Sequence, residues 1–290
     1  MASLAIIPSL AHVGVTPVQP LIGAEISGID IGNATPEERE LIHTALMRYK
    51  VVFFRDQHLT RAQHVAFGQQ FGELEVHPLS AHPDHPEMLV LKSEGEASEG
   101  ALAPAADYWH TDTTFRERPS AASILLGYAI PPLGGDTLWC NTVALYEGLD
   151  ADLKARIDSL EAVHNGLVSF ARHLNTPEKQ AAFLERYPPQ THPVVRIHPE
   201  TGEKLLFVNS GFTTHIVGMA EEESKALLAQ LYDEVKRPEY QVRFRWQPGS
   251  IAFWDNRSTQ HYGVADYRGF RHLERVTVVG DRPYGSPGDS

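Results

Sequence analysis

The chain shows two kinds of hydrophobic pattern, and the shorter kind is the more frequent. Nine short runs are β-branched or aromatic and are bounded by Gly, Pro, Asn or Asp, which is typical of β-strands. Many short strands with few helices favour a β-sandwich or jelly-roll core over a doubly wound parallel sheet. The predicted strands cover residues 50–54, 88–91, 122–126, 137–140, 194–197, 204–208, 242–246, 251–254 and 275–279.

Helical periodicity is confined to a few segments. The sequences TPEE at 35–38 and TRAQ at 60–63 are both capping boxes, so a helix is expected to begin at each of them. Elsewhere, apolar residues at helical spacing predict further helices. The predicted helices cover residues 39–48, 60–72, 143–149, 152–160 and 221–235.

The organisation of the chain indicates a single unit. There is no internal repeat and no long linker, so we expect one domain over residues 1–290. The stretch 93–106, SEGEASEGALAPAA, is small, acidic and aperiodic, and is expected to form a mobile loop. No GxGxxG follows a predicted strand and no GxxxxGKS or GxxxxGKT occurs, which argues against a nucleotide-binding fold.

Charge and cysteine content narrow the class further. Lys and Arg total 25 against 37 Asp and Glu, a formal net charge of −12, which excludes bulk electrostatic binding to nucleic acid or an anionic membrane. No apolar run approaches the roughly 18 to 20 residues that span a bilayer. Cys140 is the single cysteine, so no intrachain disulfide or cysteine-based metal site forms. We expect a soluble cytoplasmic protein.

Histidine is abundant, with 15 residues, and five of them have an acid two positions later, against about two expected by chance. Three of these triplets, at His82, His85 and His198, have proline in the middle, which favours turns. His192, His198 and His215 are interpreted as loop or surface residues. His110-Thr111-Asp112 instead follows aromatic residues and is predicted to begin a strand, where residues i and i+2 face one side and can bind one metal.

A 2-His-1-carboxylate iron site needs a third ligand from a distant part of the chain. His261 follows a predicted core strand and the polar sequence DNRSTQ, of which Asp255-Asn256-Arg257 is expected to fix the turn. Taken alone, His261 is more often an ordinary surface or core histidine. However, Arg271 and Arg275 follow in a predicted strand, and a buried strand arginine needs an anion. Two arginines near a metal imply two anionic groups.

Together these motifs resemble the taurine dioxygenase family of iron(II)- and 2-oxoglutarate-dependent oxygenases. The resemblance implies a mainly β fold with flanking helices, the double-stranded β-helix or jelly roll. It extends from residues 23–28 through 51–57 to 280–283. The matching motifs are WHTD at 109–112, GGDTLW at 134–139, WDNR at 254–257, His261, Arg271 and Arg275.

The resemblance also implies the site residues. His110, Asp112 and His261 would bind Fe(II) and form the catalytic centre, with O2 as a co-substrate. Thr137 and Arg271 would bind the distal carboxylate of 2-oxoglutarate. Arg271 is aligned by its four-residue spacing to Arg275, because the loop after His261 is one residue shorter than in taurine-specific members. His272 is the alternative in that position, and a neutral imidazole would hold a carboxylate poorly.

The predicted substrate pocket departs from that of the taurine enzyme. His77 and Arg275 match the positions that bind the sulfonate, and Ser169, Phe170 and Phe212 match other pocket positions. Ser80 and Ala106 replace a tyrosine and an asparagine that line the amine end of taurine. Because these replacements remove volume and hydrogen-bond partners, we expect a roomier pocket that is less selective for an amine.

The resemblance implies hydroxylation of the carbon beside the anionic head group of a small organic acid. A sulfonate, which would release sulfite and an aldehyde, is the first interpretation. An alkyl sulfate ester or an aryloxyalkanoate is the alternative within the family. A jelly-roll metal protein without turnover, or a metal-dependent hydrolase, is the alternative of another class, and neither would need a second anion site at Thr137 and Arg271. The oligomeric state, including a homo-oligomer, is left open.

Overall fold

The computed structural model describes residues 6–76, 82–93, 107–171 and 173–285. His77, Ser80, Ala106 and the expected loop beyond Ser93 lie outside these residues. The strands are β1 (Gly14–Pro17), β2 (Ala24–Ser27), β3 (Val51–Phe54), β4 (Met88–Ser93), β5 (Ser120–Ala129), β6 (Thr137–Asn141), β7 (Glu161–His164), β8 (Gln190–Pro193), β9 (Val195–Ile197), β10 (Lys204–Leu206), β11 (Thr213–Ile216), β12 (Gln241–Phe244), β13 (Ile251–Asp255), β14 (Thr259–Gly263) and β15 (Arg271–Val279). The helices are α1 (Pro36–Tyr49), α2 (Arg61–Gln69), α3 (Thr142–Gly148), α4 (Ala151–Ile157), α5 (Leu167–Phe170), α6 (Pro177–Arg186) and α7 (Glu221–Glu234), with short 3-10 helices η1 (Ile31–Asn33) and η2 (Pro238–Tyr240).

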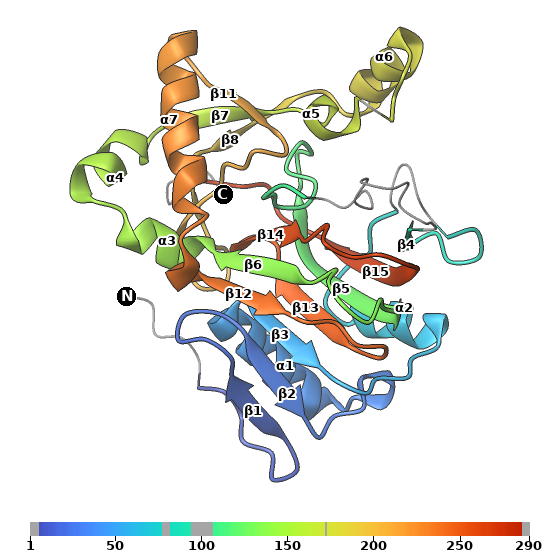
Figure 1. Ribbon diagram of the computed structural model, residues 1–290. Coiled ribbons are helices and arrows are strands. Elements are labelled where there is room, and N and C mark those ends of the chain that lie inside the picture. The colour runs from blue at the N-terminus through green and yellow to red at the C-terminus, as the bar shows by residue number, and fades with distance from the viewer. Residues whose placement is uncertain (1–5, 77–81, 94–106, 172, 286–290) are drawn as a thin grey trace.

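Two sheets form the centre of the molecule. The larger has the strand order β1-β2-β3-β13-β5-β15-β4, and the smaller has the order β12-β6-β14 (Figure 1). A buried apolar cluster joins the inner face of the larger sheet to the smaller sheet. It contains Ile22, Val51, Phe53, Leu125, Trp139, Val242, Phe244, Trp246, Ala252, Trp254 and Leu273. The predicted mainly β fold with flanking helices is therefore confirmed, with the two-layer core of a jelly roll.

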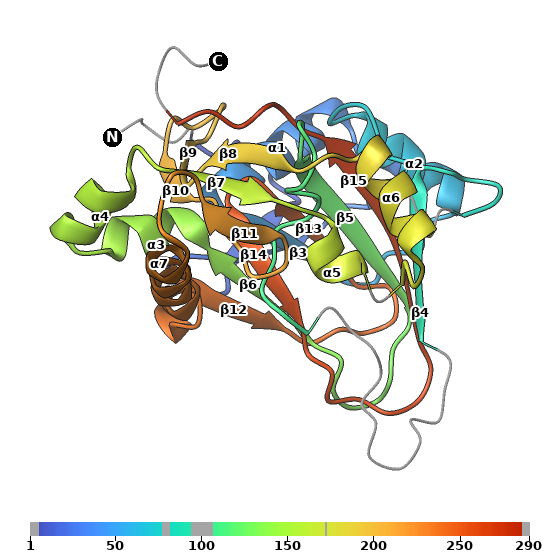
Figure 2. The same cartoon turned by 90° about the horizontal axis from the view of Figure 1, so that it is seen from above.

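Helices α1 and α2 cover the outer face of the larger sheet (Figures 1 and 2). Apolar residues of α1, among them Leu41 and Leu46, share a buried cluster with Val52 and Phe253 of the sheet. The ring of Phe253 also packs edge-on against that of Phe71, 4.8 Å away. Because strand side chains alternate between faces, one set of residues contacts these helices while its neighbours along each strand face the smaller sheet.

A third region lies at one end of the two-sheet core. It consists of the sheet β11-β7-β8, the hairpin β9-β10 and helices α5, α6 and α7 (Figure 2). Its aromatic cluster, formed by Phe115, Phe170, Phe183, Tyr187 and Phe212, contacts the core near the turn that follows His110. This region therefore brings Phe170 and Phe212 to the same end of the sheets as the predicted metal ligands.

The alternation along β15 separates its charged side chains. Leu273 belongs to the cluster between the sheets, whereas Val276 belongs to the cluster under α1 and α2. Arg271 and Arg275 share the inner face with Leu273 by the two-residue period. Glu274 faces outward, where Arg61 of α2 donates two hydrogen bonds of 2.7 Å to its carboxylate.

All nine predicted strands and all five predicted helices form, most with ends shifted by one to three residues. The prediction missed β1, β2, β7, β8, β11, β14, α5 and α6. Several of these elements have polar sequences, such as TQHYG in β14 and QTHP in β8, so their strand conformation comes from pairing with neighbours and not from an apolar pattern. In the part of the chain that the structure describes, no helix combines the length and hydrophobicity needed to cross a bilayer.

Both predicted capping boxes are present. At the start of α1, the Glu38 N–H donates to Thr35 Oγ1 at 3.2 Å, and the Thr35 N–H donates to Glu38 Oε2 at 2.7 Å. The substitution Thr35→Ala removes the side-chain acceptor, so we expect the free energy of unfolding to fall by about 1 kcal/mol. Urea denaturation measures this change, and Thr35→Ser is the control. Equal losses in both variants would contradict a capping role of the hydroxyl.

Candidate active site

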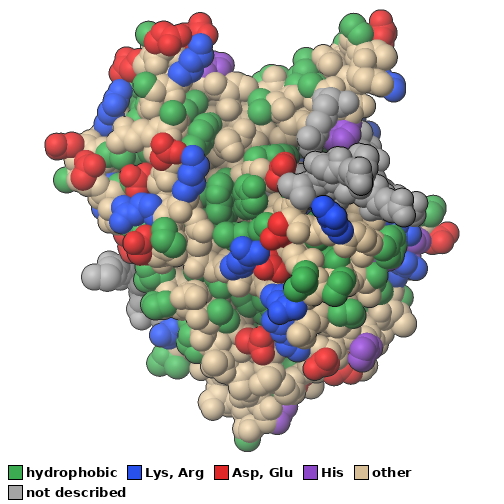
Figure 3. Space-filling model, in the orientation of Figure 1, with side chains coloured by type: hydrophobic (Ala, Val, Ile, Leu, Met, Phe, Trp, Pro, Cys, Tyr) green, Lys and Arg blue, Asp and Glu red, His purple; other side chains and the backbone are tan. Residues whose placement is uncertain are grey.

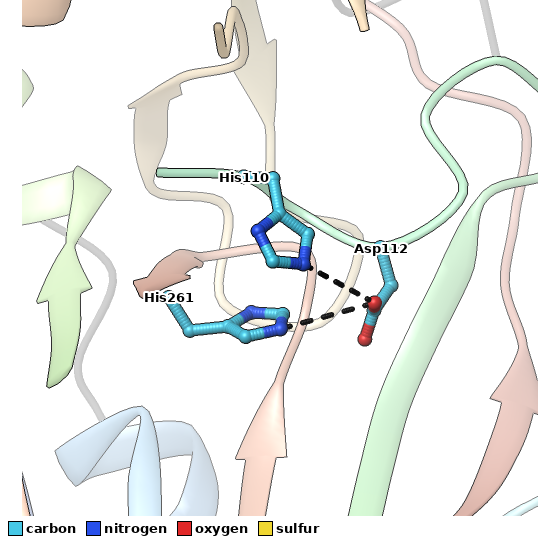
Figure 4. Close-up of side chains that lie close together, drawn as sticks. All are labelled: His110, Asp112 and His261. Atoms are coloured by element: carbon cyan, nitrogen blue, oxygen red, sulfur yellow. Dashed lines mark ion pairs between the residues drawn. The ribbon is translucent and has the colours of Figure 1, made fainter. Parts of the chain in front are cut away.

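Three side chains that could hold a metal ion meet at one end of the core. The Nε2 atoms of His110 and His261 lie 3.9 and 3.8 Å from Oδ1 of Asp112 (Figure 4). All three residues are buried, and their candidate ligand atoms lie within 4.8 Å of one another. Among the described residues, this is the one such group of His, Cys, Asp or Glu.

The backbone places the two histidines side by side. The His110 N–H donates to the His261 carbonyl at 3.1 Å, and the His261 N–H donates to the His110 carbonyl at 2.8 Å. This isolated bridge extends the edge of β14 and leaves the imidazole centroids 4.1 Å apart. A further bond from Thr111 Oγ1 to the Thr259 carbonyl, 2.8 Å long, anchors the same segment to β14.

The prediction that His110-Thr111-Asp112 begins a strand is wrong, because the chain turns directly after the bridge. Thr113 has a φ of +52°, in the left-handed region that β-branched residues rarely adopt. The conformation is held by Ser120, whose N–H donates to Thr113 Oγ1 at 3.0 Å and whose hydroxyl lies 2.6 Å from the same atom. A turn, and not strand alternation, brings Asp112 to the two imidazoles.

A hydrogen bond orients the ligand atom of His110 toward Asp112. Nδ1 of His110 lies 2.9 Å from the Tyr108 carbonyl, which only accepts, so Nδ1 carries the proton and the lone pair of Nε2 faces Asp112. Burial lowers the pKa of both His110 and His261 below the ordinary imidazole value. Neutral imidazoles are the form that binds a metal, so the donor set fits Fe(II).

The two carboxylate oxygens of Asp112 have different surroundings. Oδ2 accepts hydrogen bonds from Arg275 Nη1 at 2.7 Å and from Ser123 Oγ at 3.2 Å, while Oδ1 faces the imidazoles. Burial alone would raise the pKa of Asp112, but the charge and hydrogen bond of the Arg275 guanidinium bring it below its ordinary value. The carboxylate is therefore ionised and offers one oxygen to a metal.

The polar turn after β13 supports His261, as predicted. Asp255 accepts from the Arg257 N–H at 2.7 Å and from the Arg257 side chain at 3.1 Å, and its carbonyl accepts from Thr259 Oγ1 at 2.7 Å. His198 Nε2 lies 2.7 Å from the Asp255 carboxylate, and both side chains are fully buried. The interpretation of His192 as a loop or surface residue is wrong, because His192 is buried in β8. His198 does lie in a loop, directly after β9, but it is fully buried behind the turn that presents His261.

Arg271, and not His272, faces the interior. Arg271 Nη2 donates to the Gly135 carbonyl at 3.0 Å, its guanidinium lies 5.5 Å from the Tyr267 ring, and its buried Nε has no hydrogen-bond partner among the described residues. His272 points outward, where it stacks on Tyr128 and lies 2.8 Å from Glu274. A buried guanidinium with unused donors is suited to a carboxylate.

One cavity of about 270 Å³ connects these groups. The triad, Thr137, Arg271, Arg275, Phe170 and Phe212 all line it, as the sequence predicts. Ser169 lies instead at a neighbouring hollow with Tyr108, and donates a hydrogen bond of 2.6 Å to the Gly211 carbonyl. Lining residues that the sequence analysis missed include Leu89, Leu91, Ser93, Tyr108, Leu125 and Tyr267. The alternation of Leu89 and Leu91 along the predicted strand 88–91 was a usable signal, whereas Ser93, which the prediction places in the loop 93–106, ends strand β4 in the structure.

The charged surface does not mark this site. Acidic and basic side chains are interspersed over the face shown in Figure 3, with hydrophobic side chains between them. Three cations line the cavity that contains the triad: the buried Arg275 and the partly buried Arg271, both of β15, and the exposed Lys92 of β4. Attraction of an anion therefore depends on these local groups, in a chain whose net charge is −12.

A jelly roll with a buried 2-His-1-carboxylate triad beside two inward-facing arginines defines a metal-dependent oxygenase of the Fe(II)- and 2-oxoglutarate-dependent class. The model of the family described as "Taurine catabolism dioxygenase TauD, TfdA family" matches residues 14–277, so the chain belongs to this family. The resemblance stated from the motifs and the predicted enzyme class, a 2-oxoglutarate-dependent dioxygenase, are confirmed. Fe(II) is the cofactor of this class, and 2-oxoglutarate and O2 are its co-substrates.

Curated relatives and solved structures agree with this assignment. The chain is 39% identical to an "Alpha-ketoglutarate-dependent sulfate ester dioxygenase" of Pseudomonas putida, over 99% of this chain and 96% of the relative. It is 38% identical to an "Alkylsulfatase" of Acinetobacter baylyi, over 92% and 85%. The crystal structure of a taurine dioxygenase from Burkholderia xenovorans superposes with a TM-score of 0.81 at 43% identity, covering 94% of this chain and 91% of that one.

Gly135 provides a test of how the cavity holds Arg271. Its φ is +71°, and a Cβ there would lie 3.1 Å from Tyr267 Cδ1 and 3.2 Å from Arg271 Nε. We expect Gly135→Ala to lower the free energy of unfolding by about 1–2 kcal/mol from backbone strain and to weaken 2-oxoglutarate binding by moving Arg271. Denaturation and anaerobic titration with 2-oxoglutarate measure the two effects.

Gly218 is the matched control for this substitution. Its φ is +73°, and no atom lies within 4 Å of the added Cβ. Gly218→Ala should show the same backbone strain with unchanged affinity for 2-oxoglutarate. If the two variants bound 2-oxoglutarate equally well, contact between Gly135 and Arg271 would not matter for the co-substrate.

Proposed function

We propose that this enzyme oxidises the carbon next to the anionic head group of a small organic acid, and that an alkyl sulfate ester is the first candidate substrate. His110, Asp112 and His261 hold Fe(II). The single observation that supports two anionic ligands beside the metal is the placement of Arg271 and Arg275 on the inner face of β15, both lining the cavity that contains the triad.

Each arginine has a distinct task in this proposal. Arg271 and the Thr137 hydroxyl bind the distal carboxylate of 2-oxoglutarate. Arg275 already donates to Asp112 through Nη1, and its remaining donors are available to the head group of the substrate. The guanidinium of Arg275 would then contact both Asp112 and the substrate, and so hold the substrate at a set distance from the metal. This is catalysis by positioning.

When bound, Fe(II) with 2-oxoglutarate activates O2, so that 2-oxoglutarate becomes succinate and CO2. One oxygen atom enters succinate, and the other replaces a C–H bond of the substrate with C–OH. In an alkyl sulfate, that hydroxyl and the sulfate ester then share one carbon, and the C–O bond to sulfate breaks. The products are an aldehyde, sulfate and a proton, and the hydrocarbon walls of the cavity limit access of water to the reacting carbon.

The lining of the cavity supports a hydrocarbon tail. Leu89, Leu91, Leu125, Phe170 and Phe212 contribute apolar surface. Among the lining residues that the structure describes, Asp112 is the only carboxylate, and it already pairs with Arg275. The ammonium group of taurine would find no free counter-charge on these walls, so its desolvation would be poorly compensated.

Two of the relatives named above act, by their names, on sulfate esters, which supports the first candidate. An alkylsulfonate is the second candidate, because Arg275 together with His77 matches the sulfonate-binding positions of the family and a taurine dioxygenase is among the similar structures. In the sulfonate case the same hydroxylation would release sulfite. An aryloxyalkanoate is a third outcome that the substrate test below separates.

The remaining proposals concern the chain as a whole. We propose one oxygenase domain over residues 1–290, supported by a family match that spans residues 14–277. A cytoplasmic location is supported by the single cysteine, Cys140, which is buried. The net charge of −12 argues against nucleic acid as a partner. Association into a homo-oligomer stays a prediction.

A substrate panel tests the proposed reaction. With Fe(II), 2-oxoglutarate and O2, we expect succinate formation to be fastest with hexyl or octyl sulfate, slower with hexanesulfonate, and weak with taurine and phenoxyacetate. Sulfate and sulfite are measured in the same samples. Arg275→Met should lower kcat/KM for the sulfate ester by about a hundredfold, because a buried charged hydrogen bond is lost. Arg268→Met, an exposed charge in the preceding loop, is the control, and preference for taurine would overturn the proposal.

The anion site at Arg271 separates an oxygenase from a hydrolase or a metal-storage protein. We expect visible metal-to-ligand absorption when 2-oxoglutarate is added to the Fe(II)-loaded protein without O2. Arg271→Met should weaken this binding at least about thirtyfold, because a carboxylate loses its buried cation. Mn(II) affinity, measured in parallel, should remain unchanged. Absence of absorption in the native protein would contradict the proposed reaction.

A further inference from the structure

Thr137 receives a hydrogen bond from a residue outside the cavity. The indole Nε1 of Trp246 lies 3.0 Å from Thr137 Oγ1. Trp246 is 3% exposed and Thr137 is 6% exposed, so water does not compete for this bond. The contact follows from strand pairing, because Phe244, two residues before Trp246, pairs directly opposite Thr137 between β12 and β6.

The chemistry of the two groups fixes the direction of this bond. An indole N–H is a donor only, so Thr137 Oγ1 must accept. The hydroxyl keeps one proton, and among the described residues its side chain has no other hydrogen-bond partner. Because Thr137 lines the cavity, its O–H is free to donate into the space beside Arg271.

Burial of the indole does not by itself require this arrangement. Trp139, in the same apolar cluster, has a buried Nε1 with no hydrogen-bond partner among the described residues. Trp254 donates its Nε1–H to Asn256 at 2.8 Å, within the turn that leads to His261. The core therefore accommodates an unpaired indole, and the bond from Trp246 is a specific feature of the Thr137 position.

We propose that Trp246 is a positioning residue for 2-oxoglutarate: it occupies an acceptor site of Thr137 and leaves the hydroxyl as a donor to the distal carboxylate. A carboxylate only accepts hydrogen bonds, whereas an unrestrained hydroxyl also presents lone pairs to it. The inference rests on the proposed function, in which Thr137 and Arg271 share that carboxylate.

Neighbouring residues hold the Thr137 hydroxyl and the Arg271 guanidinium in place before 2-oxoglutarate binds. The ring of Trp246 packs edge-on against Phe244, with centroids 5.2 Å apart, and lies 6.5 Å from Trp139. Arg271 is held at the Gly135 carbonyl, two residues before Thr137. Both donors are thus tied to one short segment, and an ordered pair of donors binds a carboxylate with less loss of entropy.

A double-mutant cycle in the metal-loaded enzyme tests the proposal. The variants are Trp246→Phe, Thr137→Val and the double variant, and the readout is the Kd for 2-oxoglutarate, from anaerobic absorption with Fe(II) and from calorimetry with Mn(II). We expect Trp246→Phe to raise Kd about three- to tenfold, and Thr137→Val about tenfold or more. The double variant should match Thr137→Val, because without the hydroxyl there is nothing for the indole to orient.

Controls separate positioning from packing. Phe244→Leu removes ring volume from the same cluster without removing the N–H, so it should lower the denaturation midpoint and change Kd less than twofold. Thr137→Ser retains the hydroxyl and should restore the dependence on Trp246. Mn(II) affinity should be the same in all variants.

The experiment distinguishes failure of the proposed role of Trp246 from failure of the proposed function. If Trp246→Phe weakened 2-oxoglutarate binding by the same factor with and without the Thr137→Val substitution, or left Kd unchanged, the role of Trp246 would be overturned while the proposed function stood. If the native protein bound no 2-oxoglutarate, the proposed function itself would fail.

Discussion

Two backbone hydrogen bonds between His110 and His261 determine the rest of the site. They join segments far apart in sequence and set the imidazoles side by side, and the chain turns directly after them. The turn through Thr113 then returns Asp112 to the same point, with an unfavourable φ that Ser120 stabilises. A positive φ in a β-branched residue is unfavourable and persists only where surrounding contacts hold the backbone in place, as they do beside these ligands.

Buried charge is the second constraint, and β15 shows how it is met. On the outer face, Glu274 is neutralised by Arg61. On the inner face, Arg275 neutralises Asp112. Arg271 is the exception, since its bonds reach a carbonyl and an aromatic face but no carboxylate. An unpaired buried cation is costly unless an anion joins it, so this strand is organised around a ligand that completes its charges.

Hydrogen-bonding groups behind the cavity orient the residues that line it. The carboxylate of Asp255 pairs with His198 and Arg257 beneath the turn that presents His261, and the burial of these three side chains is tolerated because they are partners of one another. Trp246 acts on Thr137 in a comparable way, through one directed bond. The groups that contact ligands are thus oriented by neighbours that never reach the cavity.

The sequence by itself indicated the family, the mainly β class, the capped helices and the three residues that meet in the candidate metal site, because apolar periodicity, caps and short motifs are local properties. It misplaced the HTD triplet in a strand and His192 in a loop or at the surface, and it did not reveal that the loop residue His198 is buried, because a turn with positive φ and the burial of a paired histidine depend on distant partners. Polar strands such as β14 were missed for the same reason. The sequence already favoured Arg271 over His272 as the inward-facing residue by its spacing to Arg275, whereas only tertiary packing decided that Ser169 lies beside the cavity and not in it.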